Sequence, residues 1–230
     1  MAKISSKISV IVPAYNEEGS IGKVLQDLGK LRNILPIMET IVVDDGSTDR
    51  TVEIVAGFPG VNCVRHDGNQ GKGAALMTGF RAATGDILVV QDADLEYSPS
   101  DIPRLVKPIL NDGADVVYGS RFKGKCEGMN LMHYIGNKVL SVITSLLYQV
   151  PITDVMTGHK CFTRQVVKSL DLQELGFNVE VEITANVLKN GWKLVEVPIT
   201  YSRRSLGKAK IRYIDGIGSM IQLIKDFLYA

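Results

Sequence analysis

The pattern on which the fold depends lies in residues 87–96, ILVVQDADLE. Its first four residues form a short apolar run, typical of a strand that is buried on both faces of a parallel sheet. Two carboxylates, Asp92 and Asp94, follow almost at once and are separated by one residue. In open parallel sheets, ligands bind just beyond the carboxyl ends of the strands. This stretch therefore predicts a strand whose end presents paired acids to a binding crevice.

Similar apolar runs alternate with helical patterns through the first half of the chain. The predicted strands are Ile8–Val12, Thr40–Asp44, Cys63–His66, Ile87–Gln91 and Val116–Gly119, and the predicted helices between them are Ser20–Leu31, Thr51–Ala56, Ala74–Ala83 and Pro99–Leu110. This alternation indicates βαβ units and an α/β fold with a mostly parallel sheet flanked by helices.

The second half of the chain is less regular. It predicts helices at Asn130–Tyr148, Gln165–Leu170, Glu180–Lys189 and from about Tyr213, with a strand at Leu194–Ile199. No internal repeat and no low-complexity linker interrupts the sequence. We therefore expect a single domain over residues 1–230.

Composition and charge narrow the class of protein. The 230 residues carry a formal net charge of +1, which gives no reason to expect a nucleic-acid partner. Three scattered cysteines without a CxxC spacing suit a reducing compartment, and the N-terminus has no signal-peptide pattern. We therefore expect a cytoplasmic protein. The basic residues gather near the C-terminus, at Arg203, Arg204, Lys208, Lys210 and Arg212.

No stretch reaches the ~18 to 20 consecutive apolar residues that span a bilayer. Val139–Val150 and Ile217–Ala230 come nearest, and polar or charged residues interrupt both. They are typical of amphipathic helices, for which core packing and contact with a membrane surface are both open. Together with the basic cluster, they make peripheral association with a membrane one of our expectations.

The acids after the fourth predicted strand indicate a metal site. Carboxylates separated by one residue can point into the same crevice and hold Mg²⁺ or Mn²⁺, which prefer oxygen ligands and bridge to phosphates. Glu96 is spaced to be a further ligand or to orient one. The alternative is an Asp-rich turn with solvated charges, which is less favoured after a fully apolar strand and among other acids.

Polar residues also follow the other predicted strands. Pro13–Glu18 comes after the first strand, Asp44–Asp49 after the second and Gly119–Arg121 after the fifth. A tyrosine in the first segment could stack on a base, and an acid in the second could accept a hydrogen bond from a base N–H. Turn formation and helix capping are the alternatives.

Residues 69–75, NQGKGAA, open a predicted helix with glycines and Lys72. The N–H groups and positive end of a helix suit a diphosphate. The spacing is not that of a P-loop, and no GxGxxG follows the first strand.

These motifs, in this order, resemble those of a known family. VIVPAYNEE, VVDDGSTDRT, NQGKGAALMTGFRAATGD, QDADLE and YGSRF resemble the family-two glycosyltransferases of GT-A fold. The segments from DVMTGHKCF to KAKIRYIDG resemble the polyprenyl-phosphate branch, typified by dolichol-phosphate mannose synthase. The resemblance runs from Ile8 to the final helix. It implies a donor half at residues 1–125 and an acceptor half with its own helices at 126–230.

On the donor side, the resemblance implies a nucleotide diphosphate sugar and a divalent metal. The residues matched to nucleotide-sugar positions are Pro13, Tyr15, Glu17, Val43, Asp44, Asp45, Asp92, Ala93, Asp94 and Arg121, of which Val43 lines the base pocket and Asp44 has a supporting role. Lys72, at the start of the predicted helix, is a further candidate for binding the nucleotide sugar. The metal positions match Asp92, Asp94 and Glu96.

On the acceptor side, the resemblance implies a polyprenyl phosphate and assigns catalytic roles to Asp94, Arg121, Arg204 and Lys210. Arg204 and Lys210 match positions that handle the acceptor phosphate. His133 stands where relatives often carry an arginine for that phosphate, and Ala209 replaces a usual serine. The sequence ends at Ala230 without the transmembrane helices that some relatives carry, so a membrane-anchoring partner subunit and a truncated chain are both open.

The resemblance implies direct attack on the anomeric carbon with inversion. An ionised lipid phosphate needs no strong base, whereas a saccharide hydroxyl would need one, and Asp154 is then the candidate. Two alternatives of other classes remain: a nucleotidyltransferase and a non-catalytic nucleotide-sugar binder.

Overall fold

The computed structural model describes residues 6–203 together with Gly218, Gln222, Leu223, Lys225 and Phe227. Arg204 and Lys210 lie outside the described residues, as does most of the helix predicted from about Tyr213. The five described residues of that segment are helical.

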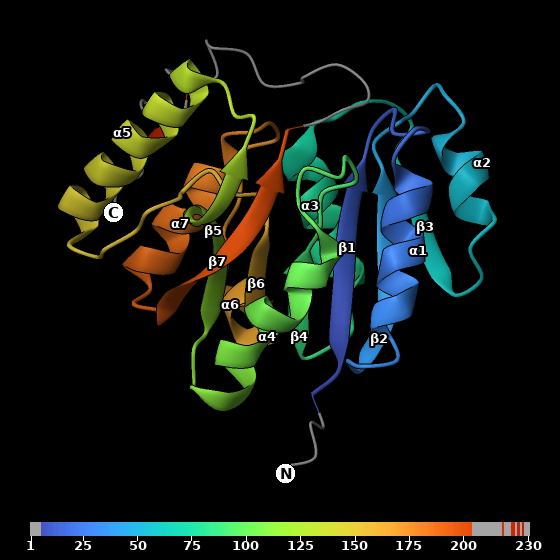
Figure 1. Cartoon of the computed structure of the whole chain (residues 1–230), viewed down its shortest axis with the longest axis horizontal. Helices are drawn as coiled ribbons and strands as arrows, with labels where there is room; N and C mark the ends of the chain where they lie inside the picture. The colour runs from blue at the N-terminus through green and yellow to red at the C-terminus, as the bar shows by residue number, and fades with distance from the viewer. Residues whose placement is uncertain (1–5, 204–217, 219–221, 224, 226, 228–230) are drawn as a thin grey trace.

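The described residues form a seven-stranded sheet (Figure 1), with the order β3-β2-β1-β4-β6-β5-β7. Six strands run parallel to one another and β6 runs antiparallel to both of its neighbours. The strands are β1 (Ile8–Ala14), β2 (Ile37–Asp44), β3 (Val61–Arg65), β4 (Ile87–Val90), β5 (Val116–Glu127), β6 (Lys160–Thr163) and β7 (Leu194–Ser202). The predicted fold class is therefore confirmed.

Helices cover both faces of the sheet, as Figure 1 shows. One apolar cluster joins the sheet to α1 (Ile21–Leu31), α2 (Thr51–Ala56) and α4 (Ile102–Asn111). A second cluster on the opposite face joins it to α3 (Lys72–Ala82), α6 (Arg164–Ser169) and α7 (Val179–Lys189). Neighbouring residues of β1 alternate between the two clusters, because successive side chains of a strand point to opposite faces. The result is a three-layer arrangement.

The segment before α4 begins as the sequence predicts. Ser98 precedes a short 3-10 helix, η1 (Pro99–Asp101), and its hydroxyl accepts a hydrogen bond from the Ser100 N–H. Pro99 occupies the first helical position, where the missing N–H costs nothing. These residues position the loop after β4.

α5 (Leu131–Tyr148) follows the long strand β5 and lies on the outer flank of the sheet (Figure 1). Asn130 caps it, with its side chain accepting from the Met132 N–H. A small apolar cluster that includes Leu140, Ile152 and Leu223 packs beneath it. None of the described helices has the length and apolarity needed to cross a bilayer.

Two features of the sheet differ from the sequence prediction. The strand β6 was not predicted, because its four residues begin with a lysine and show no apolar alternation. β5 and β7 also extend well beyond Gly119 and Ile199, since their polar ends pair with each other from Lys125 opposite Thr200. The insertion of β6 therefore separates the parallel strands β4 and β5.

Candidate functional site

The loops after β1, β2 and β4 meet at one edge of the sheet. Ala14 at the end of β1 pairs with Asp44 of β2, and Ile11 of β1 pairs with Val90 of β4. The Asp45 N–H also donates to the Ala14 carbonyl at 2.8 Å. Because the strands are parallel, the acids that follow them gather at this edge, as the sequence predicts.

Asp44 is fully buried at the end of β2. Its Oδ2 accepts from the Ser47 N–H at 3.2 Å and lies 3.2 Å from Arg65 Nε. Its Oδ1 is buried and has no hydrogen-bond partner among the described residues. A buried carboxylate oxygen without a donor is costly, and such atoms are usually satisfied by a ligand, an ion or water. Asp44 is thus able to accept a hydrogen bond from a bound group.

Asp45 is held within the protein by three donors. Its Oδ1 lies 2.8 Å from His66 Nδ1 and accepts from the Gln70 N–H at 2.9 Å, while Oδ2 accepts from the Gly71 N–H at 2.8 Å. His66 Nε2 in turn lies 2.9 Å from Thr78 Oγ1. Asp45 therefore fixes the segment that leads into α3. Its predicted contact with a nucleotide stays a prediction.

The sequence predicts free N–H groups in the first turn of α3, but the structure shows that two of them are hydrogen-bonded within the protein. The N–H groups of Gly73 and Ala74 both donate to the Leu175 carbonyl, at 2.7 and 3.3 Å. A side chain at Gly73 would collide with the Glu174 carbonyl, so glycine permits this close approach. These two groups are satisfied by the chain itself and are not free to hold a diphosphate.

Lys72 begins α3 and points to the acids that follow β4. Its Nζ lies 2.8 Å from Oδ1 and 3.1 Å from Oδ2 of Asp92, and 3.0 Å from Glu180 Oε1. Burial opposes a charged lysine, but the carboxylates of Asp92 and Glu180 outweigh it and raise the pKa of Lys72. The ammonium is thus a cation already bound at the predicted metal position.

Asp94 and Glu96 lie in the same short loop, where the Glu96 N–H donates to Asp94 Oδ1 at 3.0 Å. Leu95 between them adopts a left-handed conformation with φ of 65°. Burial, followed by the negative charges of Asp92 and Glu96, raises the pKa of Asp94 to about 7. Crowded carboxylates of this kind favour a cation among them.

The donor chemistry at this loop fits a hard divalent cation. Asp92 and Asp94 offer oxygen ligands, and the Lys72 ammonium on both oxygens of Asp92 shows that a cation fits there. Across the part of the chain that the structure describes, no group of three or more metal-binding side chains is preassembled. The two carboxylates would therefore hold a metal together with oxygens of a bound phosphate.

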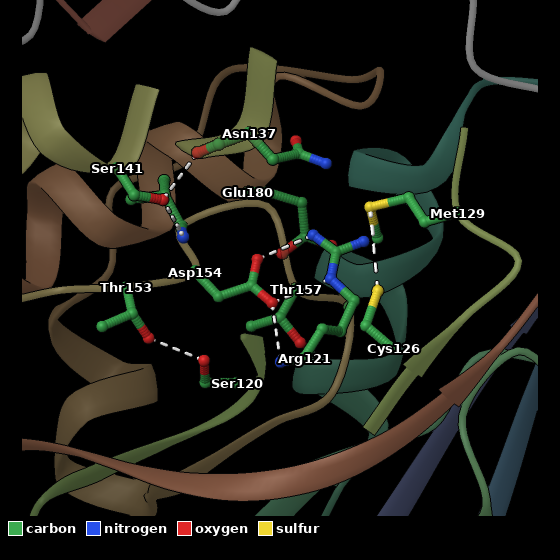
Figure 2. Close-up of polar contacts among 12 residues, drawn as sticks. Ser120, Arg121, Cys126, Met129, Asn137, Ser141, Thr153, Asp154, Thr157 and Glu180 are labelled. Atoms are coloured by element: carbon green, nitrogen blue, oxygen red, sulfur yellow. Dashed lines mark hydrogen bonds and ion pairs between the residues drawn. The ribbon is translucent and has the colours of Figure 1, made fainter. Parts of the chain in front are cut away.

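Arg121 of β5 forms a buried ion pair with Asp154 (Figure 2). Its Nε and Nη2 donate to the two carboxylate oxygens at 2.8 and 2.7 Å, and its backbone N–H donates to Oδ2 at 2.9 Å. Despite burial, the Asp154 charge raises the pKa of Arg121. The guanidinium carbon also lies 5.6 Å from the centre of the Tyr201 ring. Arg121 is consequently held in one orientation.

This ion pair corrects the sequence interpretation of Asp154 as a general base. Its side chain is fully buried, and both oxygens are engaged by Arg121. Glu196 of β7 fixes the same loop by accepting from the Thr153 and Asp154 N–H groups. Taking a proton at Asp154 would first require the buried ion pair to break. In the structure its two oxygens hold the Arg121 guanidinium in place.

The remaining predicted residues are spread around the same edge and beyond it. Glu17 is buried after β1, where its carboxylate accepts from the Ser20 hydroxyl at 2.7 Å. Pro13 lies within β1 and Tyr15 directly follows it, and both are half-buried. Val43 and Ala93 are buried in the two core clusters, and His133 is half-buried in the first turn of α5. Their roles stay predictions.

Sequence reasoning missed Lys160 and Glu180. Lys160 on β6 is fully buried and is paired with Glu180 at the start of α7. Both lie in the segments that resemble the polyprenyl-phosphate branch, but the resemblance assigns neither of them a role. The signal that could have drawn attention is a lysine opening an otherwise apolar run, KCFT, since charged residues are rarely buried without a partner.

Comparison with known proteins places the chain in a family. The family model described as "Glycosyl transferase family 2" matches residues 9–171. The chain is 33% identical over 215 residues to a dolichol-phosphate mannosyltransferase of Pyrococcus furiosus, covering 90% of this chain and 59% of that protein. It is 35% identical to a UDP-N-acetylglucosamine–dolichyl-phosphate N-acetylglucosaminyltransferase of Methanococcus voltae, covering 84% of each chain.

A solved structure shares the fold. Glucosyl-3-phosphoglycerate synthase from Mycobacterium tuberculosis, in complex with Mg²⁺ and UDP, matches with a TM-score of 0.77 and 24% identity, covering 98% of this chain and 79% of that one. The family resemblance predicted from the sequence motifs is confirmed by the family model and by the curated relatives. The protein, with its acids gathered at one edge of a mostly parallel sheet, belongs to glycosyl transferase family 2.

Proposed function

We propose that the protein transfers a hexose from a nucleoside diphosphate sugar to a polyprenyl monophosphate, with inversion at the anomeric carbon. The observation that carries the proposal is the meeting of Asp44, Asp92 and Asp94 at one sheet edge in a family-2 chain. The names of the P. furiosus and M. voltae relatives, both of which act on dolichyl phosphate, support the acceptor class.

On the donor side, Asp44 receives a hydrogen bond from the nucleotide base at Oδ1, the oxygen to which no described residue donates a hydrogen bond. Asp92 and Asp94 would hold Mg²⁺ or Mn²⁺, whose positive charge would offset the negative charge of the leaving diphosphate. The M. tuberculosis protein of the same fold was crystallised with Mg²⁺ and UDP, which supports this choice of ion. Lys72 adds positive charge beside the same phosphates.

On the acceptor side, Arg121 orients the phosphate or the transferred sugar, and Asp154 fixes Arg121. His133, Arg204 and Lys210 are assigned to the acceptor phosphate from the sequence resemblance. A lipid phosphate is already ionised near neutral pH, so positioning by cations replaces a general base. This agrees with a site in which Asp154 is not available as a base. The acceptor half, residues 126–230, contains His133, Asp154, Arg204, Lys210 and α5, and Arg121 lies just before it.

The exposed face of α5 supports a location at a membrane surface. Met132, Ile135, Val139, Val142 and Leu146 recur at helical spacing and are each 46–74% exposed. Lys123 and Lys125 on the strand that leads to α5 are exposed as well. An apolar stripe with basic neighbours is typical of a helix lying at the acyl boundary of an anionic membrane. A membrane-anchoring partner subunit remains part of the proposal.

One experiment tests the proposal. The protein is incubated with Mn²⁺, a short polyprenyl phosphate and, in turn, GDP-mannose, UDP-glucose or UDP-N-acetylglucosamine. We expect release of the nucleoside diphosphate together with a lipid-linked sugar from one donor, and no transfer to the corresponding polyprenol. Equal transfer to the polyprenol or to a saccharide would contradict the acceptor class. Pyrophosphate chemistry would indicate a nucleotidyltransferase, and binding without turnover a nucleotide-sugar binder.

A further inference from the structure

Four charged side chains of alternating sign run inward from the loop after β4, from two that are half-buried to two that are buried. Asp92 contacts Lys72, Lys72 contacts Glu180, and Glu180 contacts Lys160. The side chains of Lys72 and Asp92 are 13% and 16% exposed, and those of Glu180 and Lys160 are 4% and 1% exposed. Positive and negative charges balance along the row. The row therefore connects the predicted metal position to the interior of the sheet.

The inner end of the row is firmly held. Lys160 donates to the Val155 carbonyl at 3.2 Å and to the Thr157 carbonyl, in addition to its contact with Glu180. Its Nζ also lies 4.7 Å from the centre of the Tyr118 ring. Burial lowers the pKa of Lys160, and the Glu180 charge opposes that effect. Lys160 thus anchors Glu180 in place.

The Lys72 ammonium lies between two carboxylates that differ in depth and in their contacts. Asp92 lies at the binding edge, where oxygen ligands are needed for a metal, whereas Glu180 lies deeper and contacts the anchored Lys160. Gly158 leaves room for this arrangement, since a Cβ there would collide with Asp92 and lie 2.9 Å from Lys72 Nζ. A divalent cation on the Asp92 oxygens would repel the Lys72 ammonium at this short range.

We propose that Glu180 is a positioning residue of the donor site, which retains Lys72 when a divalent cation takes its place on Asp92. Lys72 neutralises Asp92 while no metal is bound and competes with the metal for it. Glu180 keeps the displaced ammonium beside the site, where it faces the diphosphate. The inference rests on the proposed function for the identity of the cation and of the phosphates.

The test measures binding of Mn²⁺ alone, from the electron paramagnetic resonance signal of the free ion. Glu180→Gln removes the retaining carboxylate, and Lys72→Met removes the competing ammonium. Glu182→Gln is the matched control, because Glu182 is a buried acid on the same helix whose carboxylate accepts from the Gln173 and Glu174 N–H groups. The double variant Lys72→Met/Glu180→Gln completes a double-mutant cycle. The cycle shows whether Glu180 affects Mn²⁺ binding through its contact with Lys72 or through its negative charge alone.

We expect Glu180→Gln to weaken Mn²⁺ binding about tenfold, as for coupled neighbours, and Lys72→Met to tighten it. The double variant should bind like Lys72→Met, because Glu180 acts through Lys72. An equal loss from Glu182→Gln, or an undiminished effect of Glu180→Gln in the Lys72→Met background, would overturn the inference.

Glu180→Gln leaves the buried Lys160 ammonium without its acid and could unfold the protein. The cycle is therefore repeated with Lys160→Met present in every variant, after circular dichroism has established that each one folds. Mn²⁺ binding is measured without donor or acceptor. If the cycle shows no coupling between Glu180 and Lys72 while the wild-type protein still binds Mn²⁺, the inference fails and the proposed function is unaffected. Failure of the wild-type protein to bind Mn²⁺ would overturn both the inference and the proposed metal dependence.

Discussion

Arg121 and Asp154 face each other through two parallel contacts, Nε to Oδ2 at 2.8 Å and Nη2 to Oδ1 at 2.7 Å. Asp154 is fully buried and Arg121 nearly so. The two residues are 33 positions apart. Glu196 of β7 holds the loop that contains Asp154 by accepting a hydrogen bond from the Asp154 N–H. A bidentate pair in such surroundings fixes the plane and direction of the guanidinium.

Replacing Asp154 with Asn should destabilise the protein by about 3 kcal/mol, because removing one partner leaves a buried charge uncompensated. Urea denaturation of the two proteins measures the difference. Glu53→Gln is the control, since it breaks the exposed pair with Arg50, and it should leave the stability unchanged. A similar loss in both variants would show that burial does not set the strength of the Arg121–Asp154 pair.

Asp94→Asn should change how stability depends on pH in the metal-free protein. The pKa of Asp94 is raised to about 7 in the folded chain, so folding favours the protonated form. Its contribution is therefore greatest near pH 4 and is lost as the pH rises to about 7. Melting temperatures in chelator between pH 4.5 and 8 should show this decline in the wild type and a smaller one in the variant. Parallel profiles would contradict the raised pKa.

The same Asp94→Asn variant should lose Mn²⁺ binding and turnover while keeping its fold, since an amide is a weaker ligand for a hard cation. Circular dichroism checks the fold, and sugar transfer with and without chelator checks the metal. Full turnover by the variant, or by the wild type in excess chelator, would exclude the proposed metal role.

His159 should make the protein sensitive to acid. It is fully buried beside Tyr97, and burial lowers its pKa to about 3. The unfolded chain then binds a proton that the folded chain rejects, so stability falls as the pH drops below the ordinary value of 6.5. The slope is about 1.4 kcal/mol per pH unit down to about pH 3. Urea denaturation at pH 6.5 and 4.5 should show this loss in the wild type and less in His159→Phe.

Leu146→Glu should weaken binding to anionic liposomes, because Leu146 is 74% exposed in the apolar stripe of α5 and a charge there resists burial at the acyl boundary. Ile34→Glu is the matched control: Ile34 is 67% exposed but follows α1 on another part of the molecule. Co-sedimentation at low and moderate salt measures the difference. Equal losses from the two variants would argue against α5 as the membrane contact.

Asp44 and Asp45 should respond differently to replacement by Asn. Asp44→Asn should weaken UDP or GDP binding about tenfold, the effect of losing one hydrogen bond to a charged group. Asp45→Asn should mainly lower the melting temperature, because Asp45 holds His66 and the segment before α3. Calorimetry and thermal melting separate the two effects. The opposite pattern would restore Asp45 as the principal contact of the base.

Much of the donor edge could be predicted from local sequence. Short apolar runs identified β1, β2 and β4, and the residues at each strand end had to lie at the same edge of a parallel sheet. The acids at 44, 45, 92 and 94 were therefore found without any long-range information. The family resemblance added the chemistry of the ligands.

The partners of those residues depended on contacts across the chain. Lys72 meets Glu180 across 108 positions (180 minus 72), and the Asp45 oxygens face a segment 25 residues later. No local pattern shows whether a carboxylate at a strand end is free or already hydrogen-bonded. Only packing decided that one oxygen of Asp44 has no hydrogen-bond partner in the described part of the chain, while both oxygens of Asp45 accept hydrogen bonds.

The sequence by itself determined the α/β class, the direction of most strands and the edge at which the acids gather, because hydrophobic periodicity and turn residues act locally. The tertiary structure decided the insertion of antiparallel β6, which local pattern could not predict from four residues beginning with Lys160. It also decided that Asp154 is buried and paired with Arg121, since burial and pairing are set by segments that meet only in the folded chain.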